Sequence, residues 1–203
     1  MDPILLIFQI AVLFLSVIVH EVSHGLMALH LGDETAKNAG RLTLNPLKHI
    51  DPIGSILVPI LTYMSGGFLF GWALPVPYNP RALYKDYVYG PLKVALAGPL
   101  SNFGLALIFG TIIRFGGGYF NPLTIQLLYS IVLLNCVLFI FNLIPIPPLD
   151  GSQILKLILP RESFFQIERL GMMGLVILII FMSVLSNFVF GIAVWLARFL
   201  VGA

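Results

Sequence analysis

Five long stretches of this chain contain no charged residue, and this feature determines whether the chain can fold in water or in a membrane. The stretches are residues 3–20, 52–80, 94–113, 115–149 and 170–197. A helix that crosses a bilayer needs about 20 mostly apolar residues, so each stretch can hold a membrane span. Over the whole chain 10% of the residues are charged and 59% are hydrophobic, whereas a soluble domain has roughly 25% charged residues. A soluble fold is therefore excluded.

This pattern predicts an all-α polytopic membrane protein with about five transmembrane helices. We expect them at residues 3–31, 52–75, 91–113, 122–143 and 171–199, in a single domain over residues 1–203 without a soluble accessory domain. The first is expected to belong to the mature protein, because it lacks the basic region and cleavage site of a signal peptide. Pro59 and three glycines interrupt the second, which is expected to be broken or tilted. A short helix is expected at 152–159.

Charge and cysteine content narrow the possible partners. The formal net charge is +2 and the basic residues are dispersed, which argues against a nucleic-acid partner. The basic residues also divide about equally between the two sides of the predicted topology, so no orientation follows from them. The single cysteine, Cys136, lies in an apolar run and is expected to be a small core residue.

The segment between the first two spans is too polar to cross a membrane. Residues 41–44 alternate between polar and apolar side chains, and Asn38, Gly40 and Asn45-Pro46 bound them. This alternation predicts a short membrane-associated β-hairpin or strand after the first helix, which could pair with an extended peptide. A surface loop with a few β-branched residues is an equally good interpretation.

Two acidic residues lie where a membrane protein rarely tolerates them. Glu21 falls inside the first hydrophobic helix, and Asp150 directly follows the fourth uncharged stretch. Prolines 145, 147 and 148 forbid a continuous helix just before Asp150, so the backbone unwinds there. Unwound backbone at membrane depth is tolerated where it is buried in protein or lines a cavity. Both acids are therefore candidates for a functional site.

The sequence around Glu21 has the spacing of a zinc site. His20 and His24 are four residues apart, so on a helix both imidazoles lie on one face and can bind one Zn²⁺. Glu21 would lie beside the metal as a general base that takes a proton from a water molecule acidified by the zinc. A His-Glu-x-x-His match by chance is improbable here, because three such residues in an apolar helix would be costly without a shared role.

Two histidines leave a catalytic zinc one protein ligand short, and three residues could supply it. His30 is ten residues after His20, which places it about 15 Å farther along an unbroken helix and out of reach of the same ion. His49 lies in a polar junction where a solvated or hydrogen-bonded role suits it better. Asp150 offers a carboxylate oxygen and is the best candidate.

With these motifs the sequence resembles the site-2 protease family of intramembrane zinc metalloproteases. The resemblance rests on three motifs: His20-Glu21-Val22-Ser23-His24, Ala97-Gly98-Pro99-Leu100-Ser101-Asn102, and Asn142 to Gly151 with its three prolines and Asp150. Gly40 to Leu47 and Pro75-Val-Pro-Tyr-Asn-Pro80 also resemble compact bacterial and archaeal members. The similar regions span about residues 16–155, and the chain is too short for the PDZ or CBS domains of other members.

The resemblance implies a protease with one zinc per chain that hydrolyses a peptide bond within or near a transmembrane segment of a membrane-protein substrate. It implies that His20, His24 and Asp150 bind the zinc and that Glu21 is the catalytic base. It also implies that Asn142 helps to position the substrate or to stabilise the oxyanion. Asn142 could instead hydrogen-bond carbonyl groups freed by the prolines. Asn102 is expected to pack helices through an interhelical hydrogen bond.

We expect an integral, multi-pass protein of a prokaryotic cell membrane, with the lipid bilayer and a transmembrane substrate as partners and a regulatory membrane partner or a homo-oligomer as further options. Two alternatives use the same ligands without proteolysis. A membrane zinc-binding or transport protein would have several polar sites along a path, whereas the sequence has one. A scaffold with a structural zinc would have four protein ligands, usually with cysteine, and Cys136 is far from the motifs.

Overall fold

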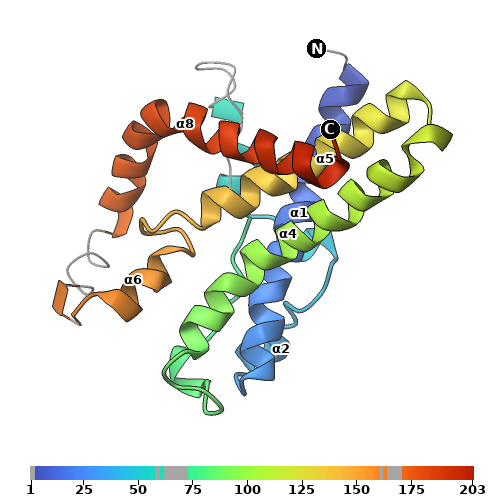
Figure 1. The fold of residues 1–203 in the computed structure, drawn as a ribbon. Helices are drawn as coiled ribbons and strands as arrows, with labels where there is room; N and C mark the ends of the chain where they lie inside the picture. The colour runs from blue at the N-terminus through green and yellow to red at the C-terminus, as the bar shows by residue number, and fades with distance from the viewer. Residues whose placement is uncertain (1–2, 58–59, 62–72, 161, 164–170) are drawn as a thin grey trace.

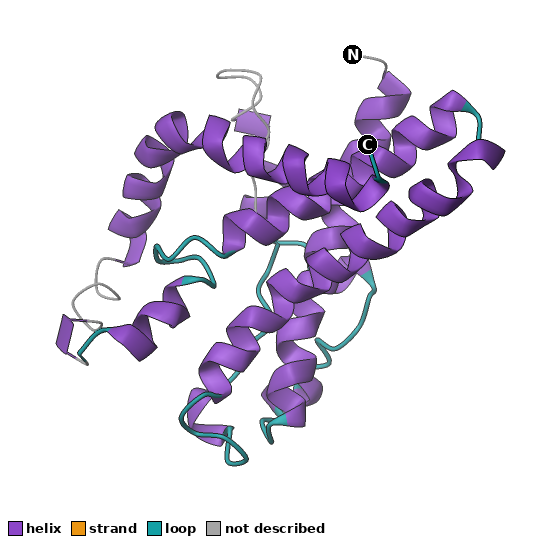
Figure 2. Ribbon diagram, viewed as in Figure 1, coloured by secondary structure: helices purple, strands orange, loops and turns teal. Residues whose placement is uncertain are grey.

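The computed structural model describes the chain except for residues 1–2, 58–59, 62–72, 161 and 164–170, and the described residues are largely helical (Figures 1 and 2). The longer helices are α1 (Pro3–His30), α4 (Gly90–Gly116), α5 (Pro122–Asn142) and α8 (Gly171–Val201). Two short α-helices are α2 (Thr35–Asn38) and α6 (Ser152–Ile158). Shorter helical segments among the described residues include η1 (Pro46–Lys48), η2 (Pro52–Leu57, a π-helix), η3 (Pro80–Ala82) and η4 (Gly117–Tyr119).

Among the described residues, three helices are long and apolar enough to cross a membrane: Leu5–His30, Gly90–Tyr119 and Pro122–Asn142. They match the predicted first, third and fourth spans to within a few residues. Helix α8 covers the predicted fifth span, and its apolar part among the described residues is Ser186–Val201. The predicted second span, residues 52–75, lies mostly outside the described residues. The number of five spans therefore stays a prediction.

The arrangement of the long helices brings two distant parts of the chain beside α1. Helices α1 and α4 run along each other, α5 returns from α4 as an antiparallel neighbour, and α8 packs across α4 and α5 (Figure 1). Asn121 caps α5, because its side-chain oxygen accepts a hydrogen bond from the Thr124 amide at 2.8 Å. Pro122 starts the helix where its missing N–H costs nothing.

Helix α5 ends at Asn142, as the prolines predicted, and a tight turn follows. The Gly151 amide donates to the Asn142 carbonyl oxygen at 2.7 Å, which closes the loop over residues 143–150. A Cβ atom on Gly151 would lie 2.3 Å from the Leu143 carbonyl oxygen, so this turn requires glycine. The turn holds Asp150 just before α6, and α6 confirms the short helix predicted at 152–159.

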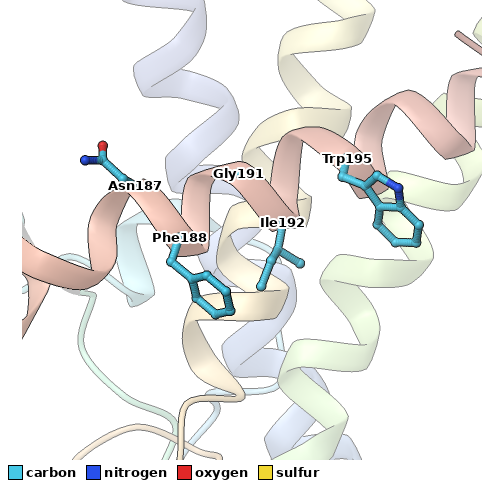
Figure 3. Close-up of a pocket in the computed structure, with 5 residues that line it drawn as sticks. All are labelled: Asn187, Phe188, Gly191, Ile192 and Trp195. Carbon is cyan, nitrogen blue, oxygen red and sulfur yellow. The ribbon is translucent and has the colours of Figure 1, made fainter.

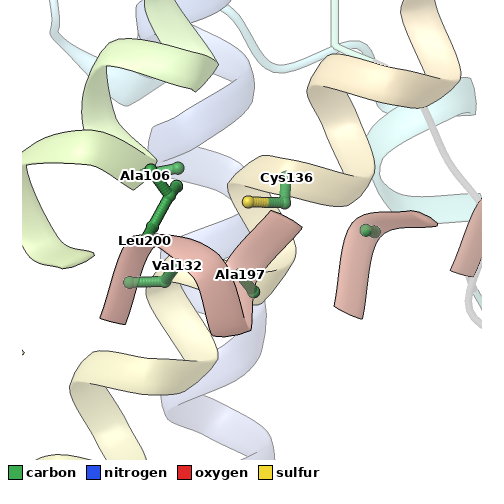
Figure 4. Packing of buried hydrophobic residues seen from close by; sticks show 6 residues of the cluster. Ala106, Val132, Cys136, Ala197 and Leu200 are labelled. Carbon is green, nitrogen blue, oxygen red and sulfur yellow. The ribbon is translucent and has the colours of Figure 1, made fainter. Parts of the chain in front are cut away.

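A cluster of small buried side chains joins α4, α5 and α8. Its members are Ala106, Val132, Cys136, Ala193, Ala197 and Leu200 (Figure 4). Small residues allow helices to approach closely where lipid supplies no hydrophobic driving force between them. Cys136 is fully buried in this cluster, which confirms its expected role as a core residue.

The β-hairpin or strand predicted after the first helix is not found, and the described residues contain no strand. Residues Thr35–Asn38 form the short helix α2, and the Arg41 amide donates to the Ala36 carbonyl oxygen at 3.0 Å in the turn that follows. Farther on, the Thr43 carbonyl oxygen accepts a hydrogen bond from Nε2 of His49 at 2.8 Å. These local partners take polar groups that a β-ladder would use, so the alternation at 41–44 was a misleading signal.

The surface of α8 carries an open hollow of about 320 Å³ lined by Asn187, Phe188, Gly191, Ile192 and Trp195 (Figure 3). Its lining is almost entirely apolar and contains no ionisable group. All five residues belong to α8 and none belongs to the predicted site. We therefore take it as part of the apolar exterior, and the functional groups lie elsewhere.

Candidate metal centre

Helix α1 presents the three polar side chains of its motif together, as the spacing predicted. The donor atoms of His20, Glu21 and His24 lie within 4.8 Å of one another. The two imidazole rings meet edge to face, with centroids 4.6 Å apart. Both histidines are buried, at 7% and 9% exposure. One turn of helix thus directs two nitrogen donors toward the same point.

Asp150 reaches this point from the turn after α5. Its Oδ2 atom lies 3.1 Å from Nε2 of His20 and 3.4 Å from Nε2 of His24. The three side chains come from motifs far apart in the sequence, and the fold brings their donor atoms together. They form two nitrogens and one carboxylate oxygen, the ligand set that the sequence predicted for zinc.

The Nδ1 atoms of both histidines are hydrogen-bonded, and their partners fix the tautomers. Nδ1 of His24 donates to the Val94 carbonyl oxygen at 2.7 Å, and Nδ1 of His20 donates to Oδ1 of Asn102 at 2.7 Å. Since both acceptors are oxygens, each Nδ1 carries a proton and each neutral ring has a lone pair at Nε2. Metal-binding histidines are held in this way in other proteins, with the second nitrogen donating to a carbonyl or carboxylate.

These contacts fit a bound cation. In the neutral tautomers, two nitrogen lone pairs and a carboxylate oxygen face one another, and Oδ2 of Asp150 is buried without a hydrogen-bond partner. Three acceptor atoms at this separation repel unless a positive charge lies among them. Space for it exists because residue 98 of α4 is glycine: a Cβ there would lie 2.4 Å from Nε2 of His24 and 2.6 Å from Nε2 of His20.

Glu21 is held by an extended segment that runs along α1, which we call the strap and define as residues 73–80. Oε2 of Glu21 accepts a hydrogen bond from the Val76 amide at 2.9 Å. Pro75 and Pro77 flank Val76, and a residue before proline favours extended backbone. Gly25 allows the close approach, because a Cβ there would lie 2.7 Å from the Val76 side chain.

The strap is anchored at both ends. Near its start, the Arg41 side chain donates to the Leu74 carbonyl oxygen at 2.7 Å, and the Leu74 amide donates to the His49 carbonyl oxygen at 2.9 Å. Near its end, the Asn79 amide donates to Oδ2 of Asp33 at 2.5 Å. These bonds come from the loops that follow α1, so the strap and the helix that carries Glu21 form one assembly.

Asp33 is buried at the end of α1 and has an altered acidity. Burial raises the pKa of its carboxyl group. Hydrogen bonds from the Thr35 hydroxyl and from the amides of Asn79 and Thr35 together lower this pKa by more than burial raises it. The net pKa lies below the ordinary value of 3.8. The charged form of Asp33 is therefore the one that the folded chain stabilises.

The other sequence candidates lie apart from the three donor atoms. The main-chain oxygen of His30 accepts a hydrogen bond from Lys85 at 2.8 Å, and the ring of His49 is buried against Thr43. The side-chain amide of Asn142 donates to the Leu138 carbonyl oxygen, one turn back in its own helix, at 3.0 Å, and not to a carbonyl freed by the prolines. Asn102 does form the expected interhelical bonds, and it also contacts His20.

Sequence reasoning missed four residues of this region. Ser16 and Asn135 are buried polar side chains near His20, and their signal was polarity without charge inside apolar helices. Gly98 lies within one of the quoted motifs, but its closeness to the two histidines could not be predicted without the three-dimensional structure. Val76 acts through its main-chain amide, for which the flanking prolines are the sole sequence signal.

Comparison with known proteins gives consistent matches. Peptidase family M50 matches residues 119–185 of this chain. The chain is 38% identical over 192 residues to a Bacillus subtilis (strain 168) protein named "Putative zinc metalloprotease YwhC", covering 90% of this chain and 83% of that one. It is 30% identical over 196 residues to "Putative zinc metalloprotease Rip2" of Mycobacterium tuberculosis (strain H37Rv), covering 94% and 73%. No solved structure matches this chain.

Proposed function

This chain belongs to peptidase family M50, the site-2 protease family, and from that premise we propose where and how it hydrolyses peptide bonds. It is an intramembrane zinc metalloprotease. We assign one zinc per chain to His20, His24 and Asp150, and we assign the general base to Glu21. The assignment makes the buried point between α1 and the turn after α5 the catalytic centre.

One observation carries the assignment: with both rings neutral, Oδ2 of Asp150 is buried without a hydrogen-bond donor, although it lies 3.1 and 3.4 Å from Nε2 of the two histidines. A structural role for Asp150 would be expected to supply a donor to that oxygen, since a buried unpaired acceptor is costly. A cation at this point satisfies all three atoms. Three protein ligands also leave a fourth position open, as catalysis requires.

When bound, zinc would supply Lewis-acid catalysis. It would polarise the scissile carbonyl and lower the pKa of a water molecule, so that the water can lose a proton and attack at neutral pH. Glu21 accepts the proton of that water at one carboxylate oxygen and passes it to the leaving amine nitrogen. The Val76 amide occupies Oε2 of Glu21, so the other carboxylate oxygen is the one that we assign to proton transfer. We propose that Asn142 orients the substrate near this centre, although its amide now bonds to its own helix.

The substrate class follows from the surroundings of the site. The histidines belong to a helix that can cross a membrane, and the family acts on membrane proteins. A substrate helix buries its carbonyl groups in its own hydrogen bonds, so the scissile segment must unwind before it is attacked. We therefore expect substrates with helix-weakening residues near the cleavage site. We also propose a multi-pass location in a prokaryotic cell membrane, which the Bacillus relative supports.

The test uses the detergent-purified chain and two variants. Wild type should contain about one zinc per chain, and Asp150→Ala should lose it. Glu21→Gln should keep its zinc and cleave a reconstituted single-span reporter with glycines in its transmembrane segment about 10²–10⁴ times more slowly than wild type. Zinc retained by a folded Asp150→Ala variant would reject the ligand set. Full activity of Glu21→Gln would reject the base.

The same variants separate proteolysis from zinc transport, which the comparisons do not favour. Glu21 has no required role in transport, so Glu21→Gln would leave zinc flux into vesicles unchanged. A protein that moves zinc with either residue at position 21 and cleaves no reporter would contradict the protease assignment.

A further inference from the structure

A set of buried polar side chains leads from the metal centre into the apolar interior. We call it the polar network and define it as Ser16 of α1, Asn102 of α4 and Asn135 of α5. Their exposures are 4%, 0% and 0%. Polar groups at membrane depth are costly unless they are paired, so three of them in contact call for an explanation.

Every amide hydrogen of the network has an acceptor. Nδ2 of Asn102 donates to Oδ1 of Asn135 at 3.0 Å and to the Ser16 carbonyl oxygen at 3.3 Å. Nδ2 of Asn135 donates to the Ser16 hydroxyl and to the Ile131 carbonyl oxygen, both at 3.0 Å. Oδ1 of Asn102 is left to accept from Nδ1 of His20 at 2.7 Å.

This pattern fixes which end of the Asn102 amide faces His20. A flipped Asn102 would point its NH₂ group at the His20 N–H and its oxygen at Oδ1 of Asn135. Both contacts would then pair like with like, and both would be buried. Asn135 is fixed in the same way by the Ile131 carbonyl oxygen. The orientation of Asn102 is thus set by Oδ1 of Asn135 on α5, together with the Ser16 carbonyl oxygen on α1, and it determines which atom the ring of His20 meets.

His24 needs no such arrangement, and the contrast is informative. Its Nδ1 donates to a main-chain carbonyl oxygen of Val94, which cannot flip. The acceptor of His20 is a side-chain amide, which can present either an acceptor or a donor. Because Asn135 helps to hold Asn102 in one orientation, Oδ1 of Asn102 faces His20 as a main-chain carbonyl oxygen would.

We propose that Asn102 and Asn135 are positioning residues for the metal centre, which together hold His20 in the tautomer whose Nε2 faces Asp150. The inference rests on the proposed function, since it takes His20 as a zinc ligand. Asn102 acts directly on the ring, and Asn135 acts through Asn102. The network therefore raises the zinc affinity of the folded chain, in addition to joining three helices.

The test measures zinc affinity by chelator competition on the detergent-purified chain, with thermal unfolding recorded alongside. Asn102→Leu should weaken zinc binding about 10–100-fold, because such hydrogen-bond partners of metal ligands have effects of that size. Asn135→Leu should weaken it less, though by more than about threefold. Because Asn135 acts through Asn102, the double variant should bind zinc no more weakly than Asn102→Leu alone.

A conservative variant and two controls separate positioning from packing. Asn102→Asp keeps an oxygen that accepts from His20 but turns its second oxygen toward the acceptors of Asn135 and Ser16, so it should unfold at a lower temperature while its zinc affinity stays within about threefold of wild type. Ser101→Ala and Ser130→Ala remove hydroxyls that bond to their own helices, next to Asn102 on α4 and five residues before Asn135 on α5. Both controls should leave zinc affinity unchanged.

Unchanged zinc affinity in Asn102→Leu and Asn135→Leu, even with lower unfolding temperatures, would show that the network only joins helices and would overturn the inference. Equal losses in Asn102→Asp and Asn102→Leu would overturn it as well. If Asn102→Leu does not fold, Asn135→Leu against Ser130→Ala decides the question. A folded wild type without zinc affinity would instead refute the proposed function, and the inference with it.

Discussion

At the scale of single residues, the proposed metal centre requires a residue without a side chain at position 98. Gly98 lets α4 approach the two histidines, and a Cβ at this position would lie within 2.6 Å of both Nε2 atoms. Gly98→Ala should therefore reduce the zinc content sharply, because the methyl group occupies the space of the ion. Zinc per chain, measured on the purified and folded variant, checks this.

Gly104 of the same helix provides the matched control for Gly98. A Cβ on Gly104 would meet no atom within 4 Å. Gly104→Ala should leave the zinc content unchanged and stabilise the helix slightly. Full zinc content in Gly98→Ala would contradict the location of the site.

Sequence reasoning at this scale worked where residues carry charge or metal-binding chemistry. Glu21 and Asp150 were singled out because charged residues are costly in apolar surroundings. The structure places Asp150 beside the histidines as expected. Its role as a ligand stays a prediction. Asn135 was missed because an uncharged amide raises no such signal. The Val76 amide was missed because every residue except proline has one, and the flanking prolines indicate extended backbone but not what the amide binds.

At the scale of elements, Asp33 connects the end of α1 to the strap. Its carboxylate accepts from the Thr35 amide and from the Asn79 amide, and its pKa is lowered in the folded chain. A carboxyl group with a lowered folded pKa stabilises the fold above its unfolded pKa and loses this effect as the pH falls through the folded value. Asp33→Asn should therefore cost about 1–3 kcal/mol near pH 7.

The difference between wild type and Asp33→Asn should shrink as the pH falls below about 4, where the wild-type carboxyl also becomes neutral. Thermal unfolding of both proteins in detergent across this range checks the prediction. Glu34→Gln is the control: Glu34 pairs with Lys37 at the surface, and its loss should change stability by less than about 1 kcal/mol. A pH-independent difference for Asp33→Asn would contradict the stated cause.

Uncharged apolar stretches and proline positions predicted α1, α4 and α5 closely, and a short helix was expected where α6 lies, because these signals are local. The predicted strand at 41–44 failed for a physical reason. Alternation of side chains specifies a strand only if another strand supplies hydrogen-bond partners, and here His49 and the turn after α2 supply them. The path of the strap depends on such long-range bonds and had no periodic signal.

At the scale of the whole molecule, large apolar side chains lie on the outside. On α8, Phe188, Trp195 and Phe199 are 65%, 66% and 63% exposed. If α8 is the fifth span, Trp195 faces lipid. In a Trp72→Phe variant, which leaves Trp195 as the single tryptophan, brominated lipids should quench most of the fluorescence and aqueous iodide should quench little. The reverse pattern would place this part of α8 outside the bilayer.

The turn at Gly151 also affects how the chain reaches its final topology. It carries Asp150 back to a helix that was made more than a hundred residues earlier, so the three donor atoms meet only after α4 and α5 are in place. An ion held there acts as a reversible cross-link between the start and the later half of the chain. Such a link closes a long loop. An unlinked chain must lose the entropy of closing this loop when it folds, whereas a linked chain has already lost it. Occupancy of the centre would thus report that α1, α4 and α5 have come together.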